Sequence, residues 1–148
     1  MESTKTTDLQ SLTIIAYALM AGLALFTGIV YYLVSSGNQV GVGAIVSPQT
    51  DLLIVGGFGM MCLVMSRILS GKLLESTSEE QKREYPEAIA QYRSAKIMRL
   101  ALLEGPGLMA TVFALVTGNT SLLLIAGFML IMMWSARPSE TEFSEWRG

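Results

Sequence analysis

Four apolar stretches dominate the sequence and restrict what the chain can fold into. A helix needs about 20 apolar residues to cross the hydrocarbon core of a bilayer, with roughly 17 to 25 tolerated. The shortest stretch, the fourth, would have to stand nearly upright or thin the bilayer. With 51% hydrophobic and 15% charged residues, the chain has too little polar surface for a water-soluble protein of its size. We therefore expect an all-α, integral membrane four-helix bundle, a single domain over residues 1–148 with spans at approximately 12–34, 52–70, 97–117 and 121–136.

Positive charge is confined to one side of this predicted topology. All Lys and Arg residues lie before the first stretch, in or beside the middle connection at residues 74–96, or after the last stretch: Lys5, Arg67, Lys72, Lys82, Arg83, Arg93, Lys96, Arg99, Arg137 and Arg147. Positive residues are retained on the cytoplasmic side of a membrane. We expect both termini and the middle connection in the cytoplasm. The net charge of -2 gives no indication of a basic surface that would bind nucleic acid.

The connections carry helix-end signals. The short turn at residues 118–120 predicts that the fourth helix packs directly against the third. In the middle connection, residues 76–78 precede Glu79, Glu80 and Gln81, a helix-start pattern. Pro86 suits the first position of a further helix, which we expect to run unbroken into the third stretch.

The two halves of the chain resemble one another. Five residues from the second stretch recur 70 positions later, and five from the first recur 83 positions later. They pair Leu52, Leu53, Gly57, Phe58 and Arg67 with Leu122, Leu123, Gly127, Phe128 and Arg137, and Ile14, Ala18, Leu19, Gly22 and Leu25 with Ile97, Ala101, Leu102, Gly105 and Leu108. This pattern predicts two tandem helical hairpins in parallel orientation. Chance matching within the small apolar alphabet is the alternative.

Glu104 is the only acidic residue within the apolar stretches. It lies about 7.5 Å deeper along the third helix than Arg99. A charged carboxylate at that depth costs several kcal/mol unless it is protonated, paired with a cation or open to water. Arg67, near the inner end of the second stretch, is the favoured counter-charge, because Arg99 is offset by about 140° on the same helix.

A Gly-Pro-Gly sequence follows this carboxylate at Gly105, Pro106 and Gly107. Pro106 cannot donate a backbone hydrogen bond to Leu102, so a carbonyl is freed beside Glu104. The functional interpretation is a proton- or cation-binding site. The structural interpretation is that Glu104 only positions the third helix, either by pairing with an arginine or by reaching the lipid headgroups.

The segment YPEAIAQYRSAKIMRLALLEGPGLMATVFALVTGN has a polar, Pro-containing start and then the pattern A-L-x-E-x-x-G-L. With the glycine-bearing second stretch before it, about residues 52–119, it resembles the membrane-rotor (c, or proteolipid) subunits of rotary ATPases. The matched positions are Pro86, Ala101, Leu102, Glu104, Gly107 and Leu108. The resemblance implies that Glu104 is protonated and deprotonated as a ring turns. Pro106 beside the carboxylate departs from the family pattern.

Other chemistry has little to build on. The chain has no His, and its single cysteine, Cys62, lies in an apolar stretch, which excludes His-held haem and leaves zinc sites and disulfides unsupported. Ten Met residues favour apolar packing over a copper(I) site. No nucleophile–base pair and no phosphate-binding loop can be assembled. We expect no enzyme activity, no catalytic residue, no metal site and no cofactor.

Two features point to packing partners. Two pairs of small residues, each spaced four apart on the first stretch, would let another helix approach closely: Ala18 with Gly22, and Ala24 with Gly28. The acidic tail at residues 136–148 carries Phe143 and Trp146 and is either a docking strip for a partner or a solvated end, of which we favour the solvated end.

Two functional hypotheses follow from the sequence. The first is a small polytopic subunit of a larger membrane complex, with a structural or assembly role; its partners are the lipid bilayer and other membrane subunits or copies of itself. The second is a proton- or cation-translocating, rotor-like subunit that uses Glu104 as its intramembrane carboxylate.

Overall fold

The computed structural model describes residues 2–37, 47–78 and 84–148. Those residues form no strand, so the all-α prediction is confirmed. The predicted helix start at residues 79–81 lies outside the described part of the chain. The helices are α1 (Glu2–Ser35), α2 (Pro48–Glu75), α4 (Tyr85–Thr117), α5 (Leu122–Ser135) and α6 (Glu140–Arg147).

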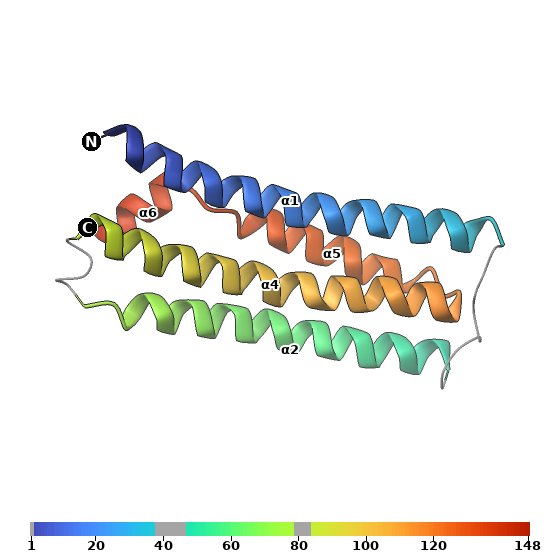
Figure 1. The fold of residues 1–148 in the computed structure, drawn as a ribbon. Coiled ribbons are helices and arrows are strands. Elements are labelled where there is room, and N and C mark those ends of the chain that lie inside the picture. The colour runs from blue at the N-terminus through green and yellow to red at the C-terminus, as the bar shows by residue number, and fades with distance from the viewer. Residues whose placement is uncertain (1, 38–46, 79–83) are drawn as a thin grey trace.

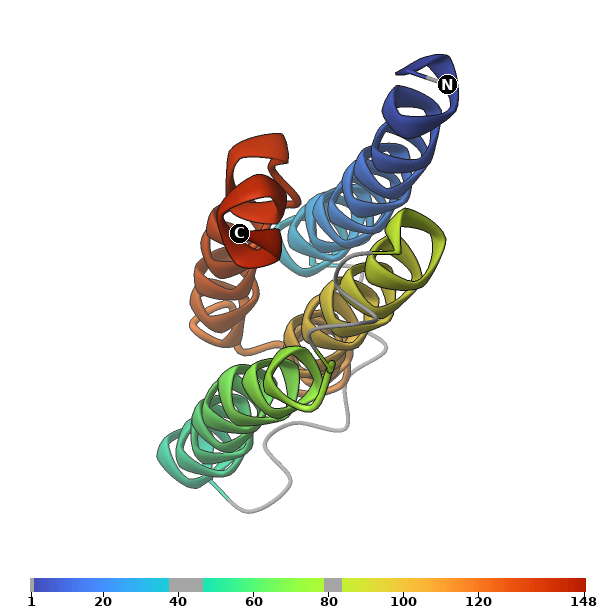
Figure 2. The ribbon, with the colours of Figure 1, turned by 90° about the vertical axis from the view of Figure 1, so that its left-hand side faces the viewer.

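Helix α4 is the centre of the bundle. It packs against α1, α2 and α5, and Figure 2 shows it lying between α1 and α2. In its most apolar window 44% of the residues are buried, against 22% in α1 and in α2. The expected tandem hairpins are therefore formed as packed pairs only in the second half, by α4 and α5. Helices α1 and α2 pack on opposite sides of α4 instead of on each other.

Three helical segments are long and apolar enough to cross a membrane: Gln10–Ser35, Pro48–Glu75 and Tyr85–Thr117. Helix α5 has 14 residues, which gives it a length of about 21 Å against roughly 30 Å of hydrocarbon. A fourth span is present only if α5 and α6 are taken together as one span bent by 57°. The first residues of α1 and the whole of α6 lie at the same end of the bundle (Figure 1).

The helix ends follow local rules. Helix α2 begins after Ser47, whose hydroxyl accepts a hydrogen bond from the N–H of Thr50 at 3.1 Å. Pro86 lies in the first turn of α4, as predicted. Gly118 ends α4 with a φ of 70°, a left-handed conformation that suits glycine, and the chain turns directly into α5. The turn predicted at residues 118–120 is confirmed.

Two glycines let the helices approach closely. A Cβ atom at Gly59 of α2 would lie 2.8 Å from Met129 Cε and 3.6 Å from Pro106 Cβ. A Cβ atom at Gly107 of α4 would lie 2.7 Å from Leu23 Cδ2. Pro106 and Gly107 are both buried, and α4 continues through them as one helix. Pro106 and Gly107 thus form a packing point where α1, α2, α4 and α5 meet.

Candidate functional site

Glu104 faces away from the helix that carries its expected counter-charge. Its neighbour Pro106 packs towards Gly59 of α2, and the two α4 positions are about 200° apart around the helix. Glu104 therefore lies on the opposite side of α4 from α2, where Arg67 is exposed. Among the described residues, no cation forms an ion pair with the Glu104 carboxylate, and neither Arg67 nor Arg99 reaches it. The pairing expected with Arg67 is not formed.

Glu104 lies at the edge of the α4 face that packs on α1, because Leu100 and Thr111, on nearly the same side of the helix, are buried. The glutamate itself is partly exposed, and Ala101 and Gly105 beside it are exposed. A Cβ atom added at Gly105 would meet nothing within 4 Å. Helix geometry places Ala101 about 60° and Gly105 about 100° around the helix from Glu104, both towards its exposed side. Small neighbours thus leave the carboxylate accessible from the side of the bundle.

A second charged site, which the sequence analysis did not identify, lies nearer the beginning of α4. Lys96 is 3% exposed, and its Nζ donates hydrogen bonds to the two carboxylate oxygens of Glu142, at 2.7 and 2.6 Å. Glu142 belongs to α6 and its side chain is 45% exposed. Burial lowers the pKa of Lys96, and the Glu142 carboxylate offsets part of that effect. The result is a fixed ion pair between α4 and α6 outside the predicted span at residues 97–117.

Tyr92 extends this contact by one helical turn. Its hydroxyl lies 3.4 Å from both the Ser139 carbonyl and Oε2 of Glu142, and its single proton can be donated to either. The side chain is fully buried. Burial, reinforced by the nearby carboxylate of Glu142, raises the pKa of Tyr92. Tyr92 therefore acts as a neutral hydrogen-bonding anchor for the connection between α5 and α6.

Aromatic contacts complete the docking of α6. The ring of Phe143 lies 5.1 Å from that of Tyr92 and 6.0 Å from that of Tyr85, both edge to face. Phe143 is 5% exposed and belongs to a buried cluster with Leu12 of α1 and Ile89 of α4. The expectation of a solvated tail is therefore wrong for α6, because its apolar side chain is covered by residues about 50 or more positions earlier in the chain. The tail docks on its own chain.

A polar link lies inside the bundle, deeper than the Lys96 site. The hydroxyls of Thr27 in α1 and Thr111 in α4 are 3.1 Å apart. Thr111 is buried and its hydroxyl also donates to the Gly107 carbonyl at 2.8 Å. Two isolated threonines on separate apolar stretches carry no sequence signal of this pairing. The link holds α1 against α4 near the packing point at Gly107.

The described residues offer few groups for metal binding or for thiol chemistry. They contain no group of three or more His, Cys, Asp or Glu side chains that would hold a metal ion. Cys62 is a free, buried cysteine. Within this part of the chain, Glu104 is the acidic group in the apolar stretches that has no ion pair, and a carboxylate in that position can bind a proton or a cation.

The chain matches no protein-family model, no curated protein and no solved structure. The resemblance to rotor subunits accordingly stays an interpretation of the motif around Glu104.

Proposed function

We propose that this protein is a small multi-pass membrane subunit that supports the assembly of a larger membrane complex. In this proposal α5 completes a four-helix membrane bundle, and both termini lie in the cytoplasm with the basic residues near them. The observation that carries the assembly role is the outward face of α1.

The small residues of α1 point away from the bundle. Ala18, Gly22, Ala24 and Gly28 are all exposed, and a Cβ atom at Gly22 or at Gly28 would meet nothing within 4 Å. The packing of α1 against α4 and α5 uses other positions, among them Leu23, which is fully buried. In a membrane, small residues favour helix association because they let two backbones approach closely. Ala18 and Gly22 lie one turn apart on one face, and Ala24 and Gly28 lie on a second face about 120° away around α1. The face of Ala18 and Gly22 therefore suits a helix from another subunit.

Replacement of Gly22 by Leu tests the assembly role. The added side chain has open space within the chain itself, so folding should be preserved while a neighbouring subunit is pushed away. The measurement is the particle mass after mild detergent extraction, which should exceed the 16.0 kDa of one chain in the wild type. We expect Gly22→Leu to reduce the recovered complex about tenfold, equivalent to about 1.4 kcal/mol.

Gly57→Leu is the matched control. Gly57 lies on α2, is exposed and also has no atom within 4 Å of an added Cβ. It should leave the particle unchanged. The assembly proposal is wrong if the wild type runs as a single chain, or if both substitutions reduce the complex equally.

A second function has its own supporting observation. The open, unpaired Glu104 suits a proton- or cation-translocating, rotor-like subunit in which the carboxylate exchanges its proton with a neighbouring protein. The small neighbours Ala101 and Gly105 leave room for such lateral contact. The motif resemblance points in the same direction. Gly105, Pro106 and Gly107 would then fix the height and facing of the carboxylate, and Arg67 and Arg99 would act only across a subunit boundary or near the surface.

Glu104→Gln tests this second function. An amide has nearly the same shape as a carboxyl group but does not ionise. Proton flux into vesicles that contain the reconstituted native particle should be abolished, whereas Glu104→Asp, which keeps the ionisable group, should retain part of it. Unchanged flux in Glu104→Gln, or wild-type flux no greater than in protein-free vesicles, would rule out the carrier role.

A further inference from the structure

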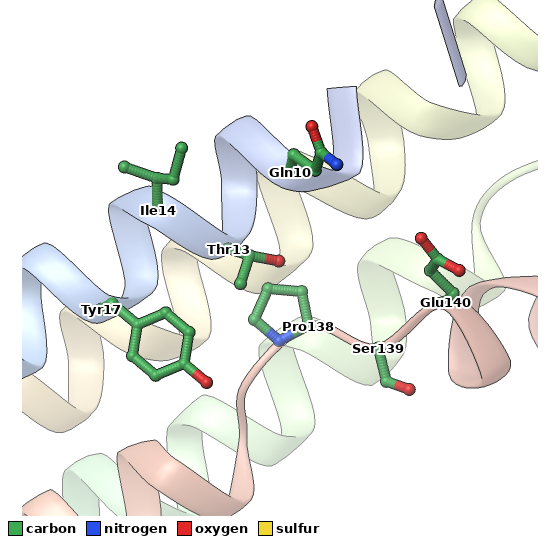
Figure 3. Close-up of a pocket in the computed structure, with 7 residues that line it drawn as sticks. All are labelled: Gln10, Thr13, Ile14, Tyr17, Pro138, Ser139 and Glu140. Carbon is green, nitrogen blue, oxygen red and sulfur yellow. The ribbon is translucent and has the colours of Figure 1, made fainter. Parts of the chain in front are cut away.

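A pocket of about 390 Å³ opens between the start of the apolar part of α1 and the connection from α5 to α6. Helix α1 contributes Gln10, Thr13, Ile14 and Tyr17, and the opposite wall is formed by residues 138–140 (Figure 3). Neither functional proposal above uses it. It lies at the end of the bundle where the start of α1 and α6 meet (Figure 1).

The pocket changes from polar to apolar along α1. Figure 3 shows Gln10 and Glu140 towards one end, and Ile14 and Tyr17 towards the other. The apolar stretch expected from the sequence begins at residue 12, between Gln10 and Thr13 of this wall. Tyr17 also makes an edge-to-face contact with Trp134 of α5, with the ring centroids 5.9 Å apart. Aromatic side chains concentrate at the membrane–water boundary, so Tyr17 and Trp134 favour a pocket at the level where lipid headgroups meet acyl chains.

The charge of the pocket comes from Glu140. It is the charged member of the pocket lining, and within the described chain no cation lies at ion-pair distance from it. Arg137, three positions earlier, instead places its guanidinium over the Trp134 ring, 4.9 Å from the ring centroid. The pocket thus presents a carboxylate acceptor, an amide at Gln10 that can donate hydrogen bonds, and an apolar floor.

We propose that this pocket binds the headgroup of a phosphoethanolamine lipid. The primary ammonium donates to the Glu140 carboxylate, the phosphate accepts from the Gln10 amide, and the glycerol and first acyl carbons cover Ile14 and the Tyr17 ring. A choline headgroup has no N–H to donate, and a purely anionic headgroup is repelled by Glu140. The proposal requires α1 to lie in a membrane but does not depend on the assembly role.

The test is lipid retention by the detergent-solubilised native particle. The protein is mixed with equal amounts of phosphatidylethanolamine, phosphatidylcholine and phosphatidylglycerol of identical acyl chains, and bound lipid is counted by native mass spectrometry. We expect preferential retention of phosphatidylethanolamine. Glu140→Gln should weaken its binding about tenfold, equivalent to about 1.4 kcal/mol. The control is Glu145→Gln, an exposed residue of the same helix outside the pocket, which should bind as the wild type does.

A second variant guards against an effect on helix α6 itself, because Glu140 lies in its first turn, where a negative charge stabilises a helix. Gln10→Ala alters the α1 wall without touching α6 and should also reduce phosphatidylethanolamine retention. Equal retention of the three lipids, a preference for phosphatidylglycerol or phosphatidylcholine, or equal losses in Glu140→Gln and Glu145→Gln would overturn the proposal. Binding that is unchanged in Gln10→Ala would overturn the assigned phosphate contact.

Discussion

Lys96 and Glu104 are two charged side chains on the same helix, about 12 Å apart along its axis, and the protein treats them in opposite ways. Lys96 is buried and held by both oxygens of Glu142 from α6. Glu104 is partly exposed and has no ion pair within the described chain. A buried charge is tolerated when its partner is built in. Glu104 must obtain its compensation from a proton, an ion, water or another subunit, which makes it the better functional candidate of the two.

Removal of the carboxylate that Lys96 depends on should have the largest effect on stability. Glu142→Gln leaves a buried ammonium without a counter-ion, which costs about 3 to 5 kcal/mol when both partners are fully buried. Because Glu142 is 45% exposed, water can replace part of the interaction, and we expect a loss of about 2 kcal/mol. Thermal unfolding in detergent measures it, with Glu145→Gln as the control. An unchanged melting temperature would show that Lys96 does not need its partner.

Removing both charges should recover much of the stability that is lost when only one partner is removed. The double variant Lys96→Met with Glu142→Leu has no unpaired ion, and replacing a buried ion pair by apolar residues is often neutral. We expect the double variant to be at least about 1 kcal/mol more stable than the sum of the two single substitutions predicts. Additive effects in this double-mutant cycle, measured by the same unfolding assay, would contradict a coupled pair.

The pH dependence of stability should distinguish the buried lysine from an exposed one. Burial lowers the pKa of Lys96, so the unfolded state binds more protons than the folded state between the two values. The free energy of unfolding should therefore rise with pH towards about 10.4, by at most about 1.4 kcal/mol per pH unit. In Lys96→Met, the free energy of unfolding should lack this rise with pH.

The stabilities of the wild type and Lys96→Met should be compared only below about pH 10, where an unfolded tyrosine begins to lose its proton. The raised pKa of Tyr92 has the opposite sign, because the folded state keeps the phenolic proton longer and stability falls as the unfolded phenol ionises. A difference between wild type and Lys96→Met that is flat over the alkaline range would contradict the lowered pKa of Lys96.

The smallest effect on stability should come from the other charge. Glu104→Gln removes no ion pair within the described chain, so the free energy of unfolding should change by about 0.5 kcal/mol or less. The same unfolding assay applies. A loss comparable to that of Glu142→Gln would instead assign Glu104 a structural role and remove the contrast between the two sites.

Features set by local chemistry were predictable from the sequence. The three long apolar helices, the proline in the first turn of α4 and the glycine that ends it follow from hydropathy, the fixed φ of proline and the left-handed conformation of glycine. Helix α5 (Leu122–Ser135) occupies the fourth apolar stretch predicted at residues 121–136, but its 14 residues qualify as a span only together with α6.

Features set by tertiary packing were not predictable. Lys96 and Glu142 are separated by 46 positions, and nothing in either segment identifies the other. Glu104 was found because it is the one acidic residue in the apolar stretches. The depth of Glu104 and Arg67 along their helices predicts the pairing of the two side chains, but depth does not specify the direction in which either side chain faces. The direction in which Glu104 faces depends on the rotation of α4, which the contact between Pro106 and Gly59 determines.

The separation between Lys96 and Glu142 also orders events during synthesis. Helix α4 emerges from the ribosome 46 residues before the carboxylate that its lysine needs, a delay of roughly 2 to 9 s at ordinary rates of elongation. In that interval Lys96 has no Glu142 to bind and is best kept in water at the membrane surface. Closure of α6 onto α4 is therefore a late step in the maturation of the protein, after insertion of the preceding helices.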